Sequence, residues 1–346
     1  MAYTTINKGS DYFNTKLYTG NGNNGVAITG VGFQPDWVWI KNRDTTNWHI
    51  LSDSVRGGNK VLYTNRTDVE RADKDWYIQS FDSDGFTVGI SGDTNGNGND
   101  LVAWNWLAGG TASSNTDGDI TSSVSANTTS GFSVVSYTGT GTAGDTIGHG
   151  LGVTPKVVIA KGRSDAGTWS VYHEGIGNAA NGVSLENTSG SRSEPAYWNS
   201  TDPTSSVFSV GTSNDTNGSS RTYIAYCFAE KKGFSKFGSY TGNGNSSGPM
   251  VYTGFKPAWV LQKNISVTQG WQLQDNKRLG YNPDNYLLQP HTDQSESALQ
   301  RVDLLSNGFK VRTTDAGQNA SGNNYIYMAF AESPFTTSTG VPTTAR

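Results

Sequence analysis

Short apolar runs alternate with turn-forming residues along the whole chain. The runs at residues 37–40 and 157–159 are bounded by proline and lysine and are rich in β-branched and aromatic side chains. Runs of this kind predict strands that are covered on both faces. Between the runs Ser, Thr, Asn and Gly are dense, and glycine alone accounts for 43 residues, which is typical of tight turns. The pattern therefore predicts an all-β fold.

One order of signals occurs three times. Each copy opens with Tyr-Thr-Gly and continues with a proline, an apolar strand and a lysine that ends the strand. The prolines are Pro35, Pro155 and Pro257, and the lysines are Lys41, Lys161 and Lys263. The lysine follows the proline by six residues in every copy, which indicates three diverged copies of one unit. Several strands in each stretch of about 100 residues predict a β-sandwich of jelly-roll type for each copy.

The copies divide the chain into five segments. We predict β-sandwich repeats over residues 1–107, 119–230 and 231–333, a linker over 108–118, and a C-terminal docking tail over 334–346. Gly, Ser, Thr and Asn dominate the linker, which predicts that the first copy moves relative to the other two. We expect the tail to dock against another copy or subunit.

Two further expectations concern the core and the sandwich rims. Trp48, Trp169 and Trp271 follow the three lysines, so we expect these tryptophans to be buried in equivalent places. The stretches 68–76 and 295–305 predict short helices, because Glu, Ala, Arg and Leu cluster there.

A repeated pair of charges follows the strand after the lysine. Asp53 with Arg56, and Asp275 with Arg278, have the same spacing, whereas the second copy has His173 in this region. We interpret the pairs as structural salt bridges across a turn, because such a bridge explains their presence in two of the three copies better than catalysis does.

Composition narrows the classes of partner. The formal net charge is −4 without any acidic or basic run, so the sequence indicates no nucleic-acid partner. Cys227 is the single cysteine and lies in an apolar strand, which predicts a buried thiol. The N-terminus lacks a basic start and an apolar core, and no apolar stretch approaches a membrane span. We therefore expect a protein made in a cytosol, without membrane insertion.

Motifs for catalysis or metal binding are weak. The four histidines show no metal-ligand spacing. Residues 93–98 resemble the opening of a calcium loop, but Trp104 stands where that loop needs its bidentate glutamate, so a plain turn is favoured. We can assign neither a carboxylate pair for glycoside hydrolysis nor a G-x-S-x-G motif. The sequence predicts a protein that is not an enzyme and holds no cofactor and no metal.

Aromatic residues outside the shared pattern are the candidates for ligand binding. They lie in or beside loop-like segments, where recognition usually occurs on a rigid sandwich. An aromatic face with polar neighbours suits a sugar ring, and it equally suits a protein interface. The candidates are Trp76, Tyr77, Tyr197, Trp198, Tyr281 and Tyr286. The alternative, that these side chains cap the local cores, stays open at this stage.

Four blocks of sequence carry a family resemblance, namely residues 1–6, 32–41, 233–242 and 325–346. In these blocks the chain resembles a tandem-repeat virion protein family of tailed bacteriophages, especially marine ones. The resemblance extends over essentially the whole chain. It implies a non-enzymatic structural protein of the virion, assembled in the host cytoplasm with other phage virion proteins.

Two classes of function fit this resemblance. A tail fibre or receptor-binding protein would touch host surface glycan, and the aromatics in turn-rich segments favour it. A head decoration or other capsid-surface protein is favoured by a chain that lacks coiled-coil heptads and a separate shaft-anchoring domain. A glycan depolymerase is a weaker alternative, because no carboxylate pair is assigned. We favour the tail fibre or receptor-binding protein.

We predict that the chain forms a homo-oligomer, namely a trimer, because phage appendages gain avidity from several weak sites. Light scattering of the purified protein and the copy number in the particle measure this directly. A strictly monomeric mass in both settings would contradict the prediction.

Overall fold

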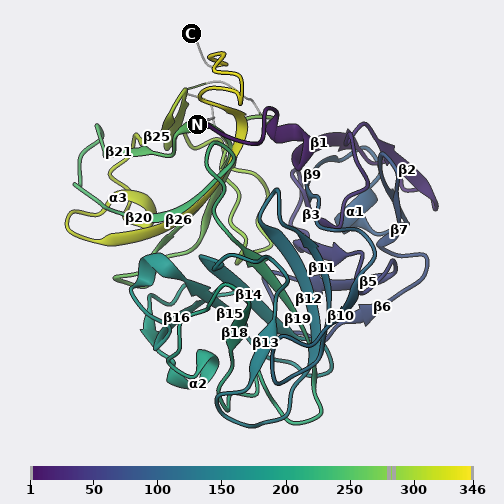
Figure 1. Ribbon diagram of the computed structural model, residues 1–346. Coiled ribbons are helices and arrows are strands. Elements are labelled where there is room, and N and C mark those ends of the chain that lie inside the picture. Colours follow the sequence, from purple (N-terminus) through teal and green to yellow (C-terminus); the bar gives the residue numbers. More distant parts are fainter. Residues whose placement is uncertain (1–2, 279–281, 283–285, 344–346) are drawn as a thin grey trace.

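The computed structural model describes residues 3–278, 282 and 286–343 of the 346-residue chain, and most of its regular structure is strand (Figure 1). The helical elements in these residues are single turns. They are η1 (Gly9–Asp11), α1 (Gly92–Asn95), η2 (Glu174–Ile176), α2 (Pro195–Trp198) and α3 (Ala316–Asn319). The prediction of an all-β fold is confirmed.

Three large antiparallel sheets share one order of four strands. The first sheet is β1 (Phe13–Thr19), β9 (Asp100–Trp106), β3 (Trp37–Asn42), β4 (Ile50–Asp53), β5 (Lys60–Tyr63) and β6 (Arg71–Ala72). The second is β10 (Ser113–Asn115), β11 (Ser122–Asn127), β12 (Phe132–Thr138), β19 (Thr222–Phe228), β14 (Val157–Gly162), β15 (Trp169–His173), β16 (Asn181–Ser184) and β17 (Arg192–Ser193). The third is β20 (Ser235–Thr241), β26 (Asn324–Pro334), β22 (Phe255–Asn264) and β23 (Gln272–Asp275). We call residues 13–106, 113–228 and 235–334 units 1, 2 and 3.

A smaller sheet packs against each large sheet and completes a sandwich. In unit 1, Ile28 and Phe86 of the small sheet share a buried cluster with Val38 and Ile50 of the large one. The corresponding cluster of unit 2 is separate from that of unit 1. The small sheets are β2 (Val26–Thr29), β8 (Gly85–Val88) and β7 (Ile78–Asp82); β13 (Thr146–Gly148) and β18 (Val207–Ser209); and β21 (Met250–Tyr252), β25 (Gly308–Val311) and β24 (Val302–Leu305).

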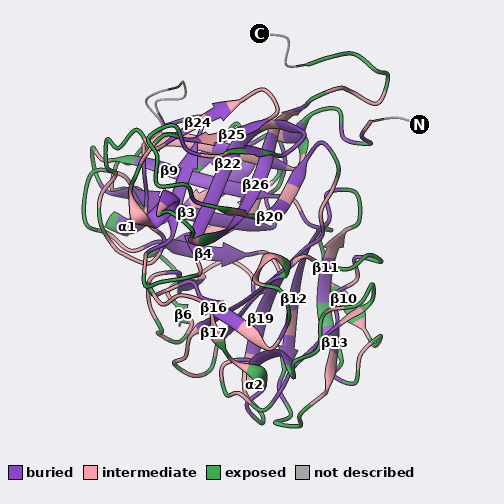
Figure 2. Cartoon of the chain, turned by 90° about the vertical axis from the view of Figure 1, so that its left-hand side faces the viewer, coloured by how far each residue is buried: buried purple, intermediate pink, exposed green. Residues whose placement is uncertain are grey.

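The other faces of the three large sheets meet in one central core. Trp37 of unit 1 lies 4.8 Å from Tyr226 of unit 2, and Phe228 of unit 2 lies 5.9 Å from Phe330 of unit 3, measured between ring centroids. Phe330 in turn lies 5.6 Å from Trp106 of unit 1, so the contacts close a ring of three units. Figure 2 shows the buried strands where the sheets meet. Each large sheet is therefore covered on both faces, by its own small sheet and by its neighbours.

Buried indoles join neighbouring units at equivalent positions. Trp169 of unit 2 donates from Nε1 to the carbonyl of Tyr63 in unit 1, at 2.8 Å. Trp271 of unit 3 donates in the same way to Ser184 of unit 2, also at 2.8 Å. Both tryptophans are core residues, as the sequence predicts, and both satisfy their polar atom across a unit boundary.

The expectation for Trp48 is wrong by one position. The pairing of β3 with β4 places His49 at the site of the other two tryptophans, and His49 is fully buried against the Gln289 backbone of unit 3. Trp48 lies on the opposite face of this segment and is only half-buried. Successive residues of an extended chain face opposite sides, so a shift of one residue moves a side chain out of the central core.

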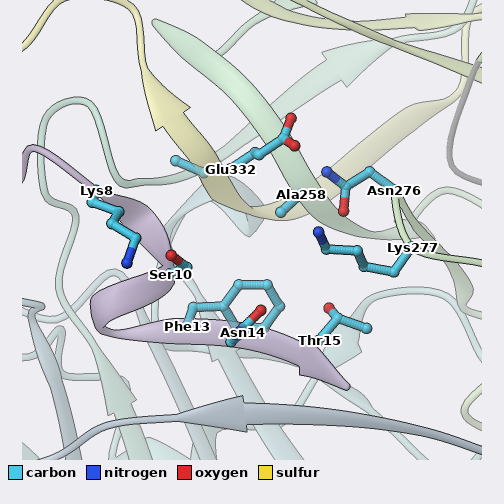
Figure 3. Close-up of a pocket in the computed structure, with 10 residues that line it drawn as sticks. Lys8, Ser10, Phe13, Asn14, Thr15, Ala258, Asn276, Lys277 and Glu332 are labelled. Atoms are coloured by element: carbon cyan, nitrogen blue, oxygen red, sulfur yellow. The ribbon is translucent and has the colours of Figure 1, made fainter. Parts of the chain in front are cut away.

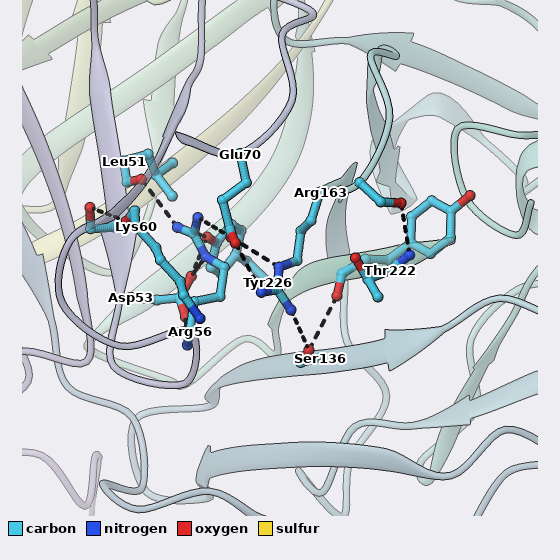
Figure 4. A network of polar contacts seen from close by, with 12 residues as sticks. Leu51, Asp53, Arg56, Lys60, Glu70, Ser136, Arg163, Thr222 and Tyr226 are labelled. Atoms are coloured by element: carbon cyan, nitrogen blue, oxygen red, sulfur yellow. Dashed lines mark hydrogen bonds and ion pairs between the residues drawn. The ribbon is translucent and has the colours of Figure 1, made fainter. Parts of the chain in front are cut away.

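A buried ionic network holds unit 1 to unit 2 (Figure 4). Asp53 accepts from Arg56 Nε at 2.5 Å and from the hydroxyl of Tyr226 in unit 2 at 2.8 Å. Glu70 bridges Arg56 to Arg163 of unit 2, at 3.0 and 2.9 Å. Burial alone would raise the pKa of Glu70, but the hydrogen bond from Arg163 and the charge of Arg56 outweigh it and lower the pKa.

The same network recurs between unit 3 and unit 1. Asp275 accepts from Arg278 Nε at 2.6 Å and from Trp104 Nε1 of unit 1 at 3.0 Å. Glu296 joins Arg278 to Arg43 of unit 1. The two charge pairs singled out in the sequence are therefore buried salt bridges that also fix unit boundaries.

The three lysines that mark the repeat are fully buried. Lys161 donates to the carbonyl of Thr67 in unit 1 at 3.1 Å, and Lys263 donates to that of Thr188 in unit 2 at 2.9 Å. Burial lowers the pKa of Lys161 to about 8 and that of Lys263 to about 7. Lys161 and Lys263 thus satisfy backbone carbonyls of the adjacent unit, whereas Lys41 donates to the carbonyls of Asn42 and Thr45 in its own unit.

A buried asparagine stabilises the turn before β9, β19 and β26. Asn95, Asn217 and Asn319 each accept from the backbone N–H of a residue just after the Tyr-Thr-Gly signal, at 2.8 to 2.9 Å. Each also donates from Nδ2 to two carbonyls. These three asparagines therefore stabilise the fold at equivalent positions of the three units.

The segment predicted as a linker is ordered against unit 1 and unit 2. Residues 108–118 include β10, and the backbone N–H groups of Ala108 and Gly110 donate to Asp36 at 2.8 and 3.2 Å. These contacts and the shared aromatic core hold the segment and unit 1 in place, whereas the composition predicts that the first copy moves. The small-residue composition that suits a flexible linker equally suits an edge strand that must pass close to its neighbours.

The two predicted short helices are wrong. Residues 68–76 contain β6, and residues 295–305 contain β24. Their charged side chains pair with distant segments, as Glu70 does with Arg163 and Glu296 with Arg43, so they make no helix-stabilising pairs within one turn.

The tail contacts the N-terminal segment of the same chain through Phe335 and Ser338. Ser338 N donates to Asn7 at 2.8 Å, and the ring of Phe335 lies 6.3 Å from that of Tyr3. Docking against another copy or subunit stays a prediction.

We predict that the free energy of unfolding falls as the pH drops from about 6.5 towards 4. Burial lowers the pKa of His173 to about 4, with Nε2 bonded to the Tyr327 carbonyl of unit 3, and likewise lowers the pKa of His291 to about 4. In this range the unfolded chain takes up protons that the folded chain does not, which costs roughly 3 kcal/mol per histidine by pH 4.

Urea unfolding between pH 7 and pH 5 measures this effect, above the range in which the carboxylates titrate. His173→Gln, which cannot titrate, should show a shallower loss than the wild type. Stability that is constant from pH 7 to pH 5 in the wild type would contradict the prediction.

Candidate ligand-binding surface

The six predicted ligand-binding aromatics differ widely in exposure. Trp76 is 43 % exposed, and Tyr286 is partly exposed. Tyr77, Tyr197 and Trp198 are buried, at 1 to 5 % exposure. Tyr281 lies outside the described residues. Trp76 and Tyr286 are thus the described candidates that reach the surface.

Tyr77 and Tyr197 are equivalent core residues of units 1 and 2. The carbonyl of Tyr77 accepts from Gly89 N at 2.6 Å, and that of Tyr197 accepts from Gly211 N at 3.1 Å. Each glycine stands six residues before its unit's buried asparagine. The expectation that these tyrosines lack counterparts in other copies is therefore incorrect, and the fold accounts for them.

Trp198 fills the core of unit 2. Its ring lies 6.4 Å from Tyr172 and 6.2 Å from Phe208, and the side chain is 2 % exposed. The one-turn helix α2 turns this side chain inward beside Tyr197. Trp198 thus caps the local core, which is the alternative that the sequence left open, and it offers almost no surface to a ligand.

Trp76 occupies a position where the fold needs no large side chain. Its carbonyl accepts from Ser91 N at 2.8 Å, and in unit 2 the carbonyl of Ala196 accepts from Ser213 N at 3.1 Å. The two residues are therefore equivalent, and unit 2 folds with an alanine. Packing does not explain the exposed indole.

Trp48 is a second tryptophan at a position where the fold needs no large side chain. The sequence pattern predicts a buried residue there and does not identify it as a surface residue. The N–H groups of Trp48 and Thr168 both donate to an aspartate carboxylate, Asp93 or Asp215, which makes the two residues equivalent. The guanidinium of Arg66 lies 4.4 Å from the Trp48 ring, in cation–π geometry. The available signal was a one-residue offset: Trp169 and Trp271 follow their lysines by eight residues, whereas Trp48 follows Lys41 by seven.

A continuous series of aromatic rings joins the two tryptophans. Trp48 lies 4.9 Å from Tyr63, Tyr63 lies 6.1 Å from Tyr77, and Tyr77 lies 6.5 Å from Trp76, between ring centroids. The hydroxyls of Tyr63 and Tyr77 are 2.8 Å apart. The buried tyrosine pair therefore holds both surface indoles on a rigid base.

Polar side chains lie beside this aromatic series. Asn24 donates to Asp75 at 3.3 Å and accepts from Gln79 at 2.5 Å. Arg71 pairs with Asp73 at 3.1 Å. Amide, carboxylate and guanidinium groups of this kind can exchange hydrogen bonds with a hydroxylated ligand. We call Trp48, Trp76 and their polar neighbours Asn24, Arg66, Arg71, Asp75 and Gln79 the unit 1 aromatic surface.

The carboxylate of Asp93, which opens the calcium-like motif, is occupied by the fold. It accepts from Trp48 N at 2.8 Å and from Asn47 Nδ2 at 3.0 Å. In the described part of the chain, no three His, Cys, Asp or Glu side chains are grouped as metal ligands. Nor does that part contain a helix long and apolar enough to cross a bilayer.

Comparison with known proteins adds the family. The sequence model of a family described as a domain of unknown function, DUF7483, matches residues 8–334. The chain belongs to the DUF7483 family. The match runs from η1 to the end of β26, so one family domain spans all three units. No curated protein and no solved structure matches the chain.

We predict that Trp76→Ala changes the free energy of unfolding by no more than about 0.5 kcal/mol, because the side chain is exposed and unit 2 has alanine there. Tyr77→Ala should cost about 3 to 5 kcal/mol, because it removes a buried ring and leaves the Tyr63 hydroxyl without its partner. Urea unfolding monitored by far-UV circular dichroism measures both variants. Equal costs for the two variants would show that the surface and core assignments are wrong.

Proposed function

We propose that this chain is a non-enzymatic structural protein of a phage virion and that it acts as a tail fibre or receptor-binding protein. The observation that carries the proposal is the exposed indole of Trp76 at a position where unit 2 has alanine. In this proposal, the unit 1 aromatic surface contacts glycan on the host cell.

The chemistry of the surface suits a sugar. The apolar face of a sugar ring stacks on an indole, and its hydroxyls exchange hydrogen bonds with planar polar side chains. Trp76 supplies the exposed ring, and Asn24, Asp75 and Gln79 supply amide and carboxylate groups beside it. Because the tyrosine pair beneath is buried, little side-chain entropy is lost when a ligand orders the site.

The buried ionisable groups support a non-catalytic role. Asp53, Glu70 and Asp275 are each bonded to an arginine, and each network crosses a unit boundary. Their ionisation therefore stabilises the arrangement of the three units.

A second exposed aromatic group favours the alternative, a head decoration or other capsid-surface protein. Tyr252 is 60 % exposed and Phe335 is 42 % exposed, near the chain ends. Lys232 lies 4.5 Å above the Tyr3 ring, and Tyr3, Lys232 and Tyr252 line one cleft. Exposed tyrosine and phenylalanine beside lysine suit a protein interface, so this group would attach the chain to another virion protein. A homotrimer remains part of the proposal, and each chain would bring its own three units.

The test compares Trp76→Ala with Tyr252→Ala, a matched removal of an exposed aromatic side chain elsewhere. We expect Trp76→Ala to reduce adsorption of particles to host cells by about tenfold or more, because one aromatic contact of about 0.5 to 1.5 kcal/mol is lost at each of several sites. Tyr252→Ala should leave adsorption of the assembled particles unchanged. Circular dichroism confirms that both variants fold.

Loss of incorporation with Tyr252→Ala, together with normal adsorption for Trp76→Ala, would favour the capsid-surface function. Normal adsorption and normal assembly for both variants would contradict both candidate functions.

A further inference from the structure

The three boundaries between units are not equivalent, because at one of them no chain segment connects the two units. Chain connections cross the first boundary at residues 107–112 and the second at 229–234, where Ala229 N donates to Gly131 at 2.7 Å. At the third boundary, β26 of unit 3 leads to the tail, and unit 1 begins separately after η1. No segment connects the two units at the third boundary, and the N-terminal segment lies there instead, with Gly9 against the Ala331 backbone and the Tyr12 ring 5.9 Å from that of Phe234.

Side chains at equivalent positions show the consequence. At the first boundary, Asp36 accepts from Ser54 Oγ at 2.6 Å and from two backbone N–H groups of the connection. At the second, Lys156 pairs with Glu174. At the third boundary, the corresponding residues are Ala258 and Asn276. Ala258 has no polar group that could bond to the side-chain amide of Asn276.

A cleft of ≈ 270 Å³ occupies this third boundary (Figure 3). Phe13, Ala258 and Ala331 form its apolar wall, and strands of both unit 1 and unit 3 contribute to it. The other lining residues are polar: Lys8, Ser10, Asn14, Thr15, Asn276, Lys277 and Glu332. The volume suits a ligand smaller than a typical drug, near the size of one sugar ring.

Three polar atoms of the lining are buried without a hydrogen-bond partner among the described residues. They are Oγ1 of Thr15, Oδ1 of Asn276 and Oε2 of Glu332, and the last of these forms an ion pair with Lys256. Thr15 is only 8 % exposed, and the equivalent residues of units 2 and 3 are the apolar Val134 and Phe237. A buried hydroxyl in place of an apolar residue is unfavourable unless something bonds to it. In Figure 3 the Thr15 side chain lies on the cleft side of β1, below Lys277.

The charges of the lining favour an anion. Glu332 is paired with Lys256 at 2.6 Å, and Lys8 is paired with Asp11 at 3.1 Å. Lys277 has no ion pair with any described residue, and its ammonium points into the cleft in Figure 3. The ammonium of Lys277 and the hydroxyl of Thr15 can both donate to a carboxylate, while Asn276 Oδ1 can accept from a ligand hydroxyl.

We propose that this cleft binds a small polyhydroxylated carboxylate, of the size and chemistry of an acidic monosaccharide. The carboxylate would bond to Lys277 and Thr15, a hydroxyl would bond to Asn276, and the apolar side of the ring would face Phe13. The site is separate from the unit 1 aromatic surface and does not rest on the function proposed above.

The test titrates the full chain with glucuronate and, separately, with glucose, and measures binding by saturation-transfer NMR and calorimetry. We expect glucuronate to bind at least tenfold more tightly than glucose, since glucose lacks the charge that Lys277 would pair with. Lys277→Gln and Thr15→Val should each weaken glucuronate binding about tenfold, a change of roughly 1.4 kcal/mol.

Thr15→Val restores the residue type of unit 2, so we expect it to keep the fold, which the urea midpoint verifies. Lys156→Gln, which removes a lysine charge at the second boundary, serves as the control that should leave glucuronate binding unchanged. No glucuronate binding by the wild type, equal binding of glucose, or undiminished binding by Lys277→Gln would overturn the proposal. None of these outcomes bears on adsorption through Trp76.

Discussion

Everything else in this structure depends on the aromatic core in which three sheets meet. A single sandwich of about 100 residues buries one face of each sheet and leaves the other to solvent. Here the second face of each large sheet carries Trp37, Tyr226, Phe330 or their neighbours, and these rings contact the next unit. Separating one unit from the other two would place these rings in water. The burial of their apolar area therefore stabilises the association of the three units. The buried salt bridges, the indole hydrogen bonds and the lysine contacts then set the register between units, because each polar group finds its partner across a boundary.

Much of the fold follows from local sequence pattern, and what does not follow is the partner of each strand. The proline–strand–lysine signal correctly predicts strands that are buried on both faces, and the Asp53–Arg56 spacing correctly predicts a salt bridge. A run such as residues 37–40 has the same composition whether its second face meets its own sandwich or another unit. The prediction of a flexible linker has a similar cause. The Gly and Ser residues of the segment do not reveal that Asp36 binds its backbone.

The candidate site was predicted only in part, for a related reason. Trp76 and Tyr77 are adjacent in sequence, yet one is exposed and the other buried, because neighbouring residues of an extended segment face opposite sides. The register that separates them comes from hydrogen bonds to the distant residues Gly89 and Ser91. Trp48 was missed by the same one-residue ambiguity. The cleft at the third boundary depends on which two units lie beside the open ends of the chain, and no local pattern contains that information.

Differential scanning calorimetry of the full chain tests most directly whether the three units share one core. A shared core predicts a single transition whose calorimetric enthalpy equals the van't Hoff enthalpy, because no unit can lose its structure without exposing the aromatic faces of the other two. Two or three resolved transitions, or a calorimetric enthalpy that exceeds the van't Hoff enthalpy severalfold, would show that the units unfold independently and that no core is shared.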